Sequence, residues 1–207
     1  MRVSRIQAEQ NRQTVINVAS QLFREHGFDG IGLKDLMEAA GLTQGAFYKQ
    51  FASKDDLAAQ ASERALESAS RRWSAAAEAN AKDPLGAVIA FYLSMGHREE
   101  RLDGCPVVAL GSDAARQGPD VKASFETGIR KYLEMLGGWI GEADGAELAG
   151  KPMAVLSTMV GAVTLSRAVN DPDLAQAFLD SAVDQVRAAV PRKRSGSHRR
   201  EKPGARR

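Results

Sequence analysis

The spacing of hydrophobic positions predicts two helices in the first part of the chain. In the first helix the apolar residues share one face, with the helical spacing of Val15, Ile16, Ala19, Leu22 and Phe23. We expect this helix to end at Gly27, because glycine readily adopts the left-handed conformation that closes many helices. The second helix is short, is expected to end at Gly41, and has apolar positions at Leu33, Leu36, Met37 and Ala40.

Two more helices are predicted after Gly41. Thr43 is a suitable N-cap for a third, short helix with residues 44–50 as its body and two inward side chains, Phe47 and Phe51. Ser53 is the expected cap of a fourth helix. No glycine or proline interrupts this fourth helix, which we expect to extend to about Ala77.

Later in the chain, prolines stand where further helices are expected to begin. The first turn of a helix does not need the N–H that proline lacks, so five positions read as start signals: Pro84, Pro106, Pro119, Pro152 and Pro172. The apolar spacing between them is helical, and no segment alternates with a period of two. The sequence therefore predicts an all-α chain, with about four helices followed by about five more.

Most of the basic charge is concentrated in a C-terminal tail. Residues 191–207 contain eight Lys or Arg against one Glu, a net charge of +7, whereas the whole chain of 207 residues has only +2. Residues 1–190 therefore carry −5, and the tail is predicted to be basic, low in complexity and disordered. The first 60 residues hold seven basic and seven acidic residues, so any DNA affinity there must come from positioned side chains.

The composition favours a soluble protein of the reducing cytoplasm. Cys105 is the single cysteine, so no intrachain disulfide framework exists. The N-terminus is too polar for a signal peptide, and no apolar run approaches the roughly 20 residues that a membrane span needs.

The stretch AAGLTQG has the spacing of the turn in a helix-turn-helix unit, whose last short helix enters the DNA major groove. Its outward positions are small, polar or basic: Thr43, Gln44, Gly45, Tyr48, Lys49 and Gln50. Glutamine can read adenine, whereas lysine, tyrosine and threonine contact phosphates or base edges. Lys54 would bind a phosphate together with the N–H groups of the next helix, and an N-terminal arm adds Arg2, Arg5 and Arg12. The alternative is a polar helical unit with solvated lysines.

Three motifs in this region share residues and spacing with a known family. They are A-x-x-L-F-x-x-x-G-F, D-L-x-x-A-A-G-L-T-x-G-x-F-Y and F-x-S-K-x-x-L. Together they resemble the DNA-binding domain of TetR-family transcriptional regulators. The resemblance implies a homodimer, usually a repressor, on a palindromic operator, with residues 1–57 as the helix-turn-helix domain and its arm. Gly32 departs from the family, which usually has Ser or Thr there, so we expect a weaker cap on the second helix.

The same resemblance implies that residues 58–190 bind a small-molecule inducer and form the dimer. Segments 153–169 and 174–190 would pair with their copies in a four-helix bundle, the first through small residues and the second through an apolar face. The candidate inducer contacts, each of which also fits plain core, are Phe91, Met95, His97, Cys105, Phe125, Ile129 and Trp139.

Cys105 is a candidate chemical sensor. It precedes Pro106 and is expected to be a helix N-cap, where the helix dipole favours the reactive thiolate. Some regulators that look similar carry a cysteine in a comparable Gly-Cys segment and respond to electrophiles or oxidants. The alternative is an inert buried thiol.

The sequence favours neither an enzyme nor a cofactor protein. Its three histidines and one cysteine form no metal-binding motif, and no glycine-rich phosphate loop follows a strand. The alternative function is a non-enzymatic helical adaptor that binds protein partners. A gel shift with the intergenic DNA beside the gene separates this adaptor from a regulator.

Overall fold

The computed structural model describes residues 4–140 and 150–190. The predicted basic tail lies outside these residues, as does Arg2. The described residues form helices and no strand, which confirms the all-α prediction. The helices are α1 (Arg5–His26), α2 (Leu33–Ala39), α3 (Gln44–Phe47), α4 (Lys54–Ala79), α5 (Pro84–Tyr92), α6 (Met95–Glu99), α7 (Pro106–Ala114), α8 (Pro119–Ile140), α9 (Gly150–Arg167) and α10 (Pro172–Ala189).

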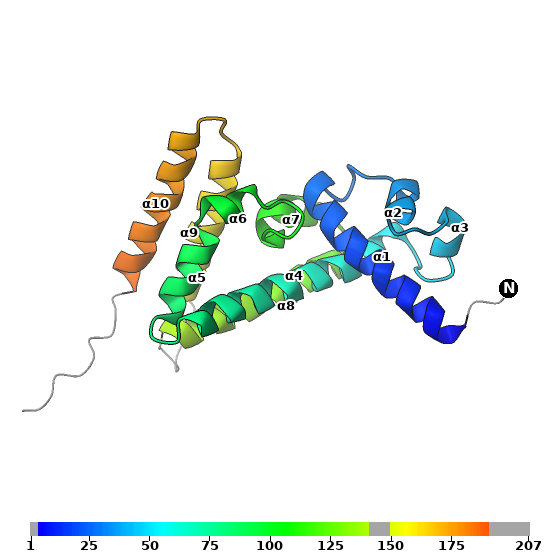
Figure 1. The fold of residues 1–207 in the computed structure, drawn as a ribbon, viewed down its shortest axis with the longest axis horizontal. Coiled ribbons are helices and arrows are strands. Elements are labelled where there is room, and N and C mark those ends of the chain that lie inside the picture. Colours follow the sequence, from blue (N-terminus) through cyan, green and yellow to red (C-terminus); the bar gives the residue numbers. More distant parts are fainter. Residues whose placement is uncertain (1–3, 141–149, 191–207) are drawn as a thin grey trace, which may run out of the picture.

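Two long helices, α4 and α8, form the axis of the molecule (Figure 1). Helices α1, α2 and α3 gather at one end of this axis as a head, and α1 packs against α4. Helices α9 and α10 pair with each other at the opposite end, with α5 beside them. Helices α6 and α7 lie between the head and the α9–α10 pair.

Helices α4 and α8 approach closely at Gly128. A Cβ on this glycine would lie 2.7 Å from side-chain atoms of Leu66, so only glycine permits the observed approach. Because of this contact, α4 and α8 pack along much of their length, and α4 is tied at its other end to the head. The head and the body thus share one continuous helix.

Local capping explains why the head folds as predicted. Gly41 has φ +71°, and the N–H groups of Gly41 and Leu42 bond to the carbonyls of Glu38 and Met37, which closes α2 in a Schellman motif. The Ser53 hydroxyl accepts a bond from the Asp56 N–H at 3.0 Å, which confirms the predicted cap of α4. The predicted weak cap at Gly32 is also confirmed, since no side chain bonds there.

Four details differ from the sequence prediction. Gly27 has the expected positive φ of 79°, but its ψ of 168° is extended rather than left-handed helical. Helix α3 ends at Phe47 and continues only as a turn, because a four-residue helix retains few internal bonds. Helix α1 begins already at Arg5, capped by Ser4, so Arg5 and Arg12 belong to a helix and not to an arm. Helix α6 was not predicted, since five residues carry no periodic signal.

No described helix is long and apolar enough to cross a membrane.

Candidate functional site

The outward side of α3 and its following turn is exposed as predicted. Thr43, Gln44, Gly45 and Lys49 are exposed, and the Tyr48 side chain is 69% exposed. Beneath them Phe47 and Phe51 are buried and stack with ring centroids 5.3 Å apart. Because the two buried rings hold the exposed polar side chains in place, the segment presents a fixed surface that could fit a DNA groove.

Three details leave this face open to an external partner. The Thr43 hydroxyl caps nothing, although Thr43 occupies the N-cap position of α3. Gly45 has no atom within 4 Å of the place where a Cβ would lie, so nothing in the described chain requires glycine there. Gln50 is half-buried, and its Oε1 has no hydrogen-bond partner among the described residues.

Two of the predicted phosphate ligands are engaged inside the head. The Lys54 Nζ donates to the Ile31 carbonyl at 2.8 Å, so this lysine is not the free phosphate contact expected from its position. The Arg12 guanidinium bonds to Gln60 and lies 5.4 Å from the centre of the Phe51 ring. Arg5 is exposed at the start of α1.

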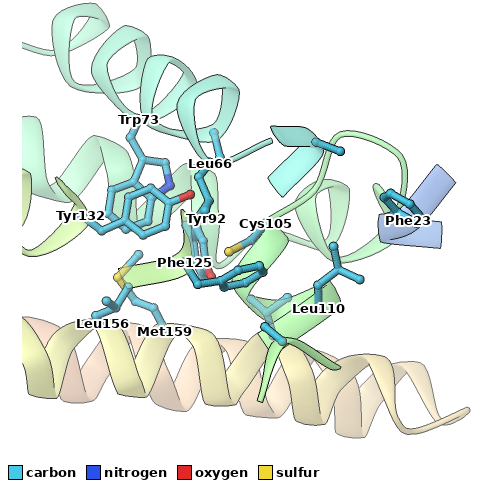
Figure 2. Close-up of a cluster of buried hydrophobic side chains, with 14 of the residues drawn as sticks. Phe23, Leu66, Trp73, Tyr92, Cys105, Leu110, Phe125, Tyr132, Leu156 and Met159 are labelled. Carbon is cyan, nitrogen blue, oxygen red and sulfur yellow. The ribbon is translucent and has the colours of Figure 1, made fainter. Parts of the chain in front are cut away.

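A cluster of aromatic and polar side chains fills the body between α4, α5 and α8 (Figure 2). Trp73 stacks on Tyr132 with ring centroids 4.6 Å apart and meets Tyr92 edge-on at 5.5 Å. His97 lies on the other side of Tyr92, at a centroid distance of 4.5 Å. Figure 2 shows Cys105 beside Tyr92, at the edge of this cluster.

The polar atoms of this aromatic cluster are incompletely satisfied. The hydroxyls of Tyr92 and Tyr132 are buried and reach no hydrogen bond of normal geometry among the described residues. The Tyr92 hydroxyl interacts with the Cys105 thiol, and burial keeps the pKa of both tyrosines well above the usual value of 10.0. Buried polar groups without partners are rare, and each calls for an explanation such as a missing ligand or water.

Burial also decides the charge state of Cys105 and His97. Cys105 is the N-cap of α7 as predicted, but it is only 3% exposed, and burial raises the pKa of its thiol. The Tyr92 hydroxyl and the first amides of α7 act in the opposite direction and are outweighed. Burial therefore favours the alternative of an inert buried thiol over the reactive thiolate. For His97, burial lowers the pKa to about 4, so the ring is neutral and its Nδ1–H donates to the Tyr92 carbonyl at 2.7 Å.

The residues predicted to contact an inducer fall in more than one place. Phe125 and Ile129 line an apolar groove of about 600 Å³ between α7 and α8. Phe91, His97 and Cys105 surround a cavity of only about 10 Å³ beside Trp73, which is room for about one water. The other two, Met95 and Trp139, line neither space.

Three arginines from distant helices hold the segment that leads to Cys105. We call residues 100–105, between α6 and α7, the junction loop. Arg24 of α1 is 6% exposed, and Arg72 and Arg167 reach the loop from α4 and α9. Together they donate to five backbone carbonyls, those of His97, Arg98, Glu100, Asp103 and Gly104. Periodicity did not reveal these contacts, because their partners are separated by 31 to 80 residues along the chain.

The α9–α10 pair has one apolar side without cover in the described chain. Leu179 and Val186 of α10 are buried against the rest of the chain. Leu165 and Leu174 are 50% and 45% exposed instead, and Met153, also 50% exposed, borders the α7–α8 groove. The apolar face predicted for dimerisation is thus divided between the monomer core and an outer surface.

Residues 4–140 and 150–190 contain no group of three or more His, Cys, Asp or Glu side chains that could hold a metal ion.

Residues 15–61 match the family model described as "Bacterial regulatory proteins, tetR family". The chain is 23% identical over 128 residues to the HTH-type transcriptional repressor NemR of Escherichia coli strain K12, which is 60% of this chain and 64% of that protein. The match thus spans less than two thirds of that relative. This chain is also 38% identical over 56 residues to the HTH-type transcriptional regulator AcrR of Shigella flexneri, which is 27% of this chain and 26% of that protein.

The fold agrees with these matches beyond the head. A crystal structure of E. coli NemR in its reduced form superposes with a TM-score of 0.73 at 20% identity, covering 87% of this chain and 98% of that one. Such a low identity shows the fold alone, but the fold includes both the head and the helical body. Residues 15–61 thus match the DNA-binding domain model of the TetR family of bacterial regulatory proteins, and the described chain shares the fold of the NemR structure.

Proposed function

We propose that this protein is a non-enzymatic, sequence-specific transcriptional repressor that a small molecule releases from a palindromic operator in the bacterial cytoplasm. The observation that carries the proposal is the exposed polar row on α3, fixed on a buried aromatic base. A protein-binding adaptor would not need a short helix that fits the DNA major groove and exposes glutamine, threonine and lysine side chains. The resemblance to a relative named as a repressor supports the direction of regulation.

In this proposal, Gln44 and Thr43 read base edges, and Tyr48 and Lys49 bind phosphates. Both groups are exposed, and the free Thr43 hydroxyl adds a donor and acceptor. Gly45 lets the DNA backbone approach closely, and Gln50 flanks the contact. Lys54 contributes only if it keeps a phosphate contact beside its bond to Ile31, since an ammonium has three donors.

A palindromic operator requires a two-fold protein, so the proposal includes a homodimer. The exposed apolar side of the α9–α10 pair is the natural interface, because a stable dimer excludes such residues from water.

We place the inducer at the aromatic cluster around Trp73, with the α7–α8 groove as its entry. Stacked rings favour a flat ligand, and two protonated tyrosine hydroxyls favour one that accepts hydrogen bonds. The cluster is closed around about 10 Å³, so binding must separate α7 from α8 at Phe125. Movement there would reach the head through α4 and the junction loop. A reactive electrophile is the alternative signal, but the raised pKa of Cys105 slows its thiol at neutral pH.

The DNA proposal is tested by selecting operator DNA from a random pool with the wild-type protein and with two variants. Gln44→Ala should relax the preference at one base pair, because it removes a direct base contact. Lys49→Ala should leave the selected sequence unchanged, weaken all DNA alike and reduce the salt slope by about one unit. Failure of the wild-type protein to enrich any palindrome would favour the adaptor. An unchanged selection by Gln44→Ala would reject the base-reading role alone.

A further inference from the structure

A polar hollow lies where the head meets the body, between α1, α6, α7 and α9. Its volume is about 320 Å³, and its charged lining consists of four arginines and two glutamates: Arg24, Arg98, Arg101, Arg167, Glu25 and Glu99. It is separate from the aromatic cluster and from the α3 face. The function proposed above makes no use of it.

Three of these arginines have donors to spare. Arg98 uses Nε and Nη2 on the carbonyls of Ser166 and Val169, at 2.9 and 3.2 Å. Arg167 uses Nε and Nη2 on carbonyls of α6 and the junction loop. Their Nη1 groups, and the whole guanidinium of the exposed Arg101, make no hydrogen bond within the described part of the chain.

The positive charge of the hollow is not neutralised by carboxylates. Arg24 pairs with Asp103 at 3.3 Å, but within residues 4–140 and 150–190 no carboxylate oxygen lies within 4.0 Å of the nitrogens of Arg98, Arg101 or Arg167. Burial lowers the pKa of Arg167, and the charges of Arg101 and Arg98 lower it further. Glu25 and Glu99 are exposed at the rim and reach none of the three. Like charges held together in a partly buried site favour binding of an anion.

We propose that this hollow is a binding site for a small oxyanion, a phosphate or carboxylate group, held by Arg98, Arg101 and Arg167. A planar guanidinium donates two parallel N–H groups to such an anion, which suits arginine better than lysine. Arg98 and Arg167 are fixed by their carbonyl bonds, so two of the three donors are positioned before binding. The exposed Arg101 closes over the anion.

The test is calorimetric titration of the full-length protein with inorganic phosphate and, separately, with succinate, at constant ionic strength set by sodium chloride. We expect saturable binding of one anion per chain, and the tighter of the two probes identifies the preferred group. Arg101→Gln should weaken binding about tenfold, since it removes one charge-assisted contact. Glu99→Gln should tighten binding, because it removes a negative charge from the rim. Arg71→Gln, at an exposed arginine outside the hollow, is the matched control for loss of charge.

Equal weakening by Arg101→Gln and Arg71→Gln would overturn the site, because it would show general charge attraction only. Heat of binding that never saturates over the titration would overturn it as well. Neither result bears on operator binding, so the anion site and the regulatory function fail separately. Thermal unfolding of each variant without anion checks the fold, which Arg101 does not support by any described bond.

Discussion

Replacing His97 by asparagine should remove a pH dependence from the stability of the fold. His97 is 5% exposed and neutral, and its Nδ1–H bonds to the Tyr92 carbonyl. The asparagine amide places a donor near the same position but does not titrate. The charged groups that act on the ring are Arg167, Arg72 and Glu100.

The size of the effect follows from the two pKa values. In the unfolded chain the histidine has a pKa near 6.5, whereas in the fold it is about 4. Below pH 6.5 the unfolded chain therefore binds the proton more readily, and stability falls as the pH falls towards 4. Linkage gives a loss of about 2 kcal/mol in the free energy of unfolding between pH 7.5 and 5.0.

The assay is urea unfolding at fixed protein concentration, followed by tryptophan fluorescence, at both pH values. The wild type and the exposed-site control His26→Asn should lose about 2 kcal/mol more than His97→Asn does on acidification. If all three proteins lost the same amount, the buried neutral state of His97 would be refuted. If the His97→Asn variant were less stable than the wild type by the same free energy at both pH values, the difference would report only the altered packing of residue 97.

Three further predictions concern the helices and the thiol. Gly128→Ala should destabilise the fold by about 1–3 kcal/mol in thermal unfolding, because the added Cβ would lie 2.7 Å from a side chain of α4. Gly138→Ala, in open space on the same helix, should stabilise the fold by about 0.5–1 kcal/mol, and equal shifts of the two variants would contradict the close crossing. Leu174→Glu should give a monomer in light scattering that is folded by circular dichroism, whereas Leu179→Glu, at a fully buried position, should unfold the chain. If the Leu174→Glu variant stayed dimeric, the dimer interface would lie elsewhere. Cys105 should react slowly with a thiol reagent at pH 7 and faster in urea, and rapid reaction in the folded protein would contradict its buried, protonated state.

The head could be predicted from sequence because its signals are local. Gly41 closes α2 and Ser53 opens α4 through bonds that span three to five residues, which a single sequence shows directly. For Cys105 the sequence left a reactive thiolate and an inert thiol open, because it does not show the burial that outweighs the nearby helix end. The burial of Arg24 and the engagement of Lys54 also depend on distant carbonyls, which hydrophobic periodicity cannot show.

The arginine-held junction loop has a consequence for the order in which the protein folds. The carbonyls of Glu100, Asp103 and Gly104 are bonded only when α9, α4 and α1 are already in place, since one arginine comes from each helix. The loop should therefore become ordered last, after the helices dock, and its amides should exchange with solvent deuterium sooner than those of α4 or α8. Because one of the three supports belongs to the head, a local opening of this loop loosens head and body at the same moment.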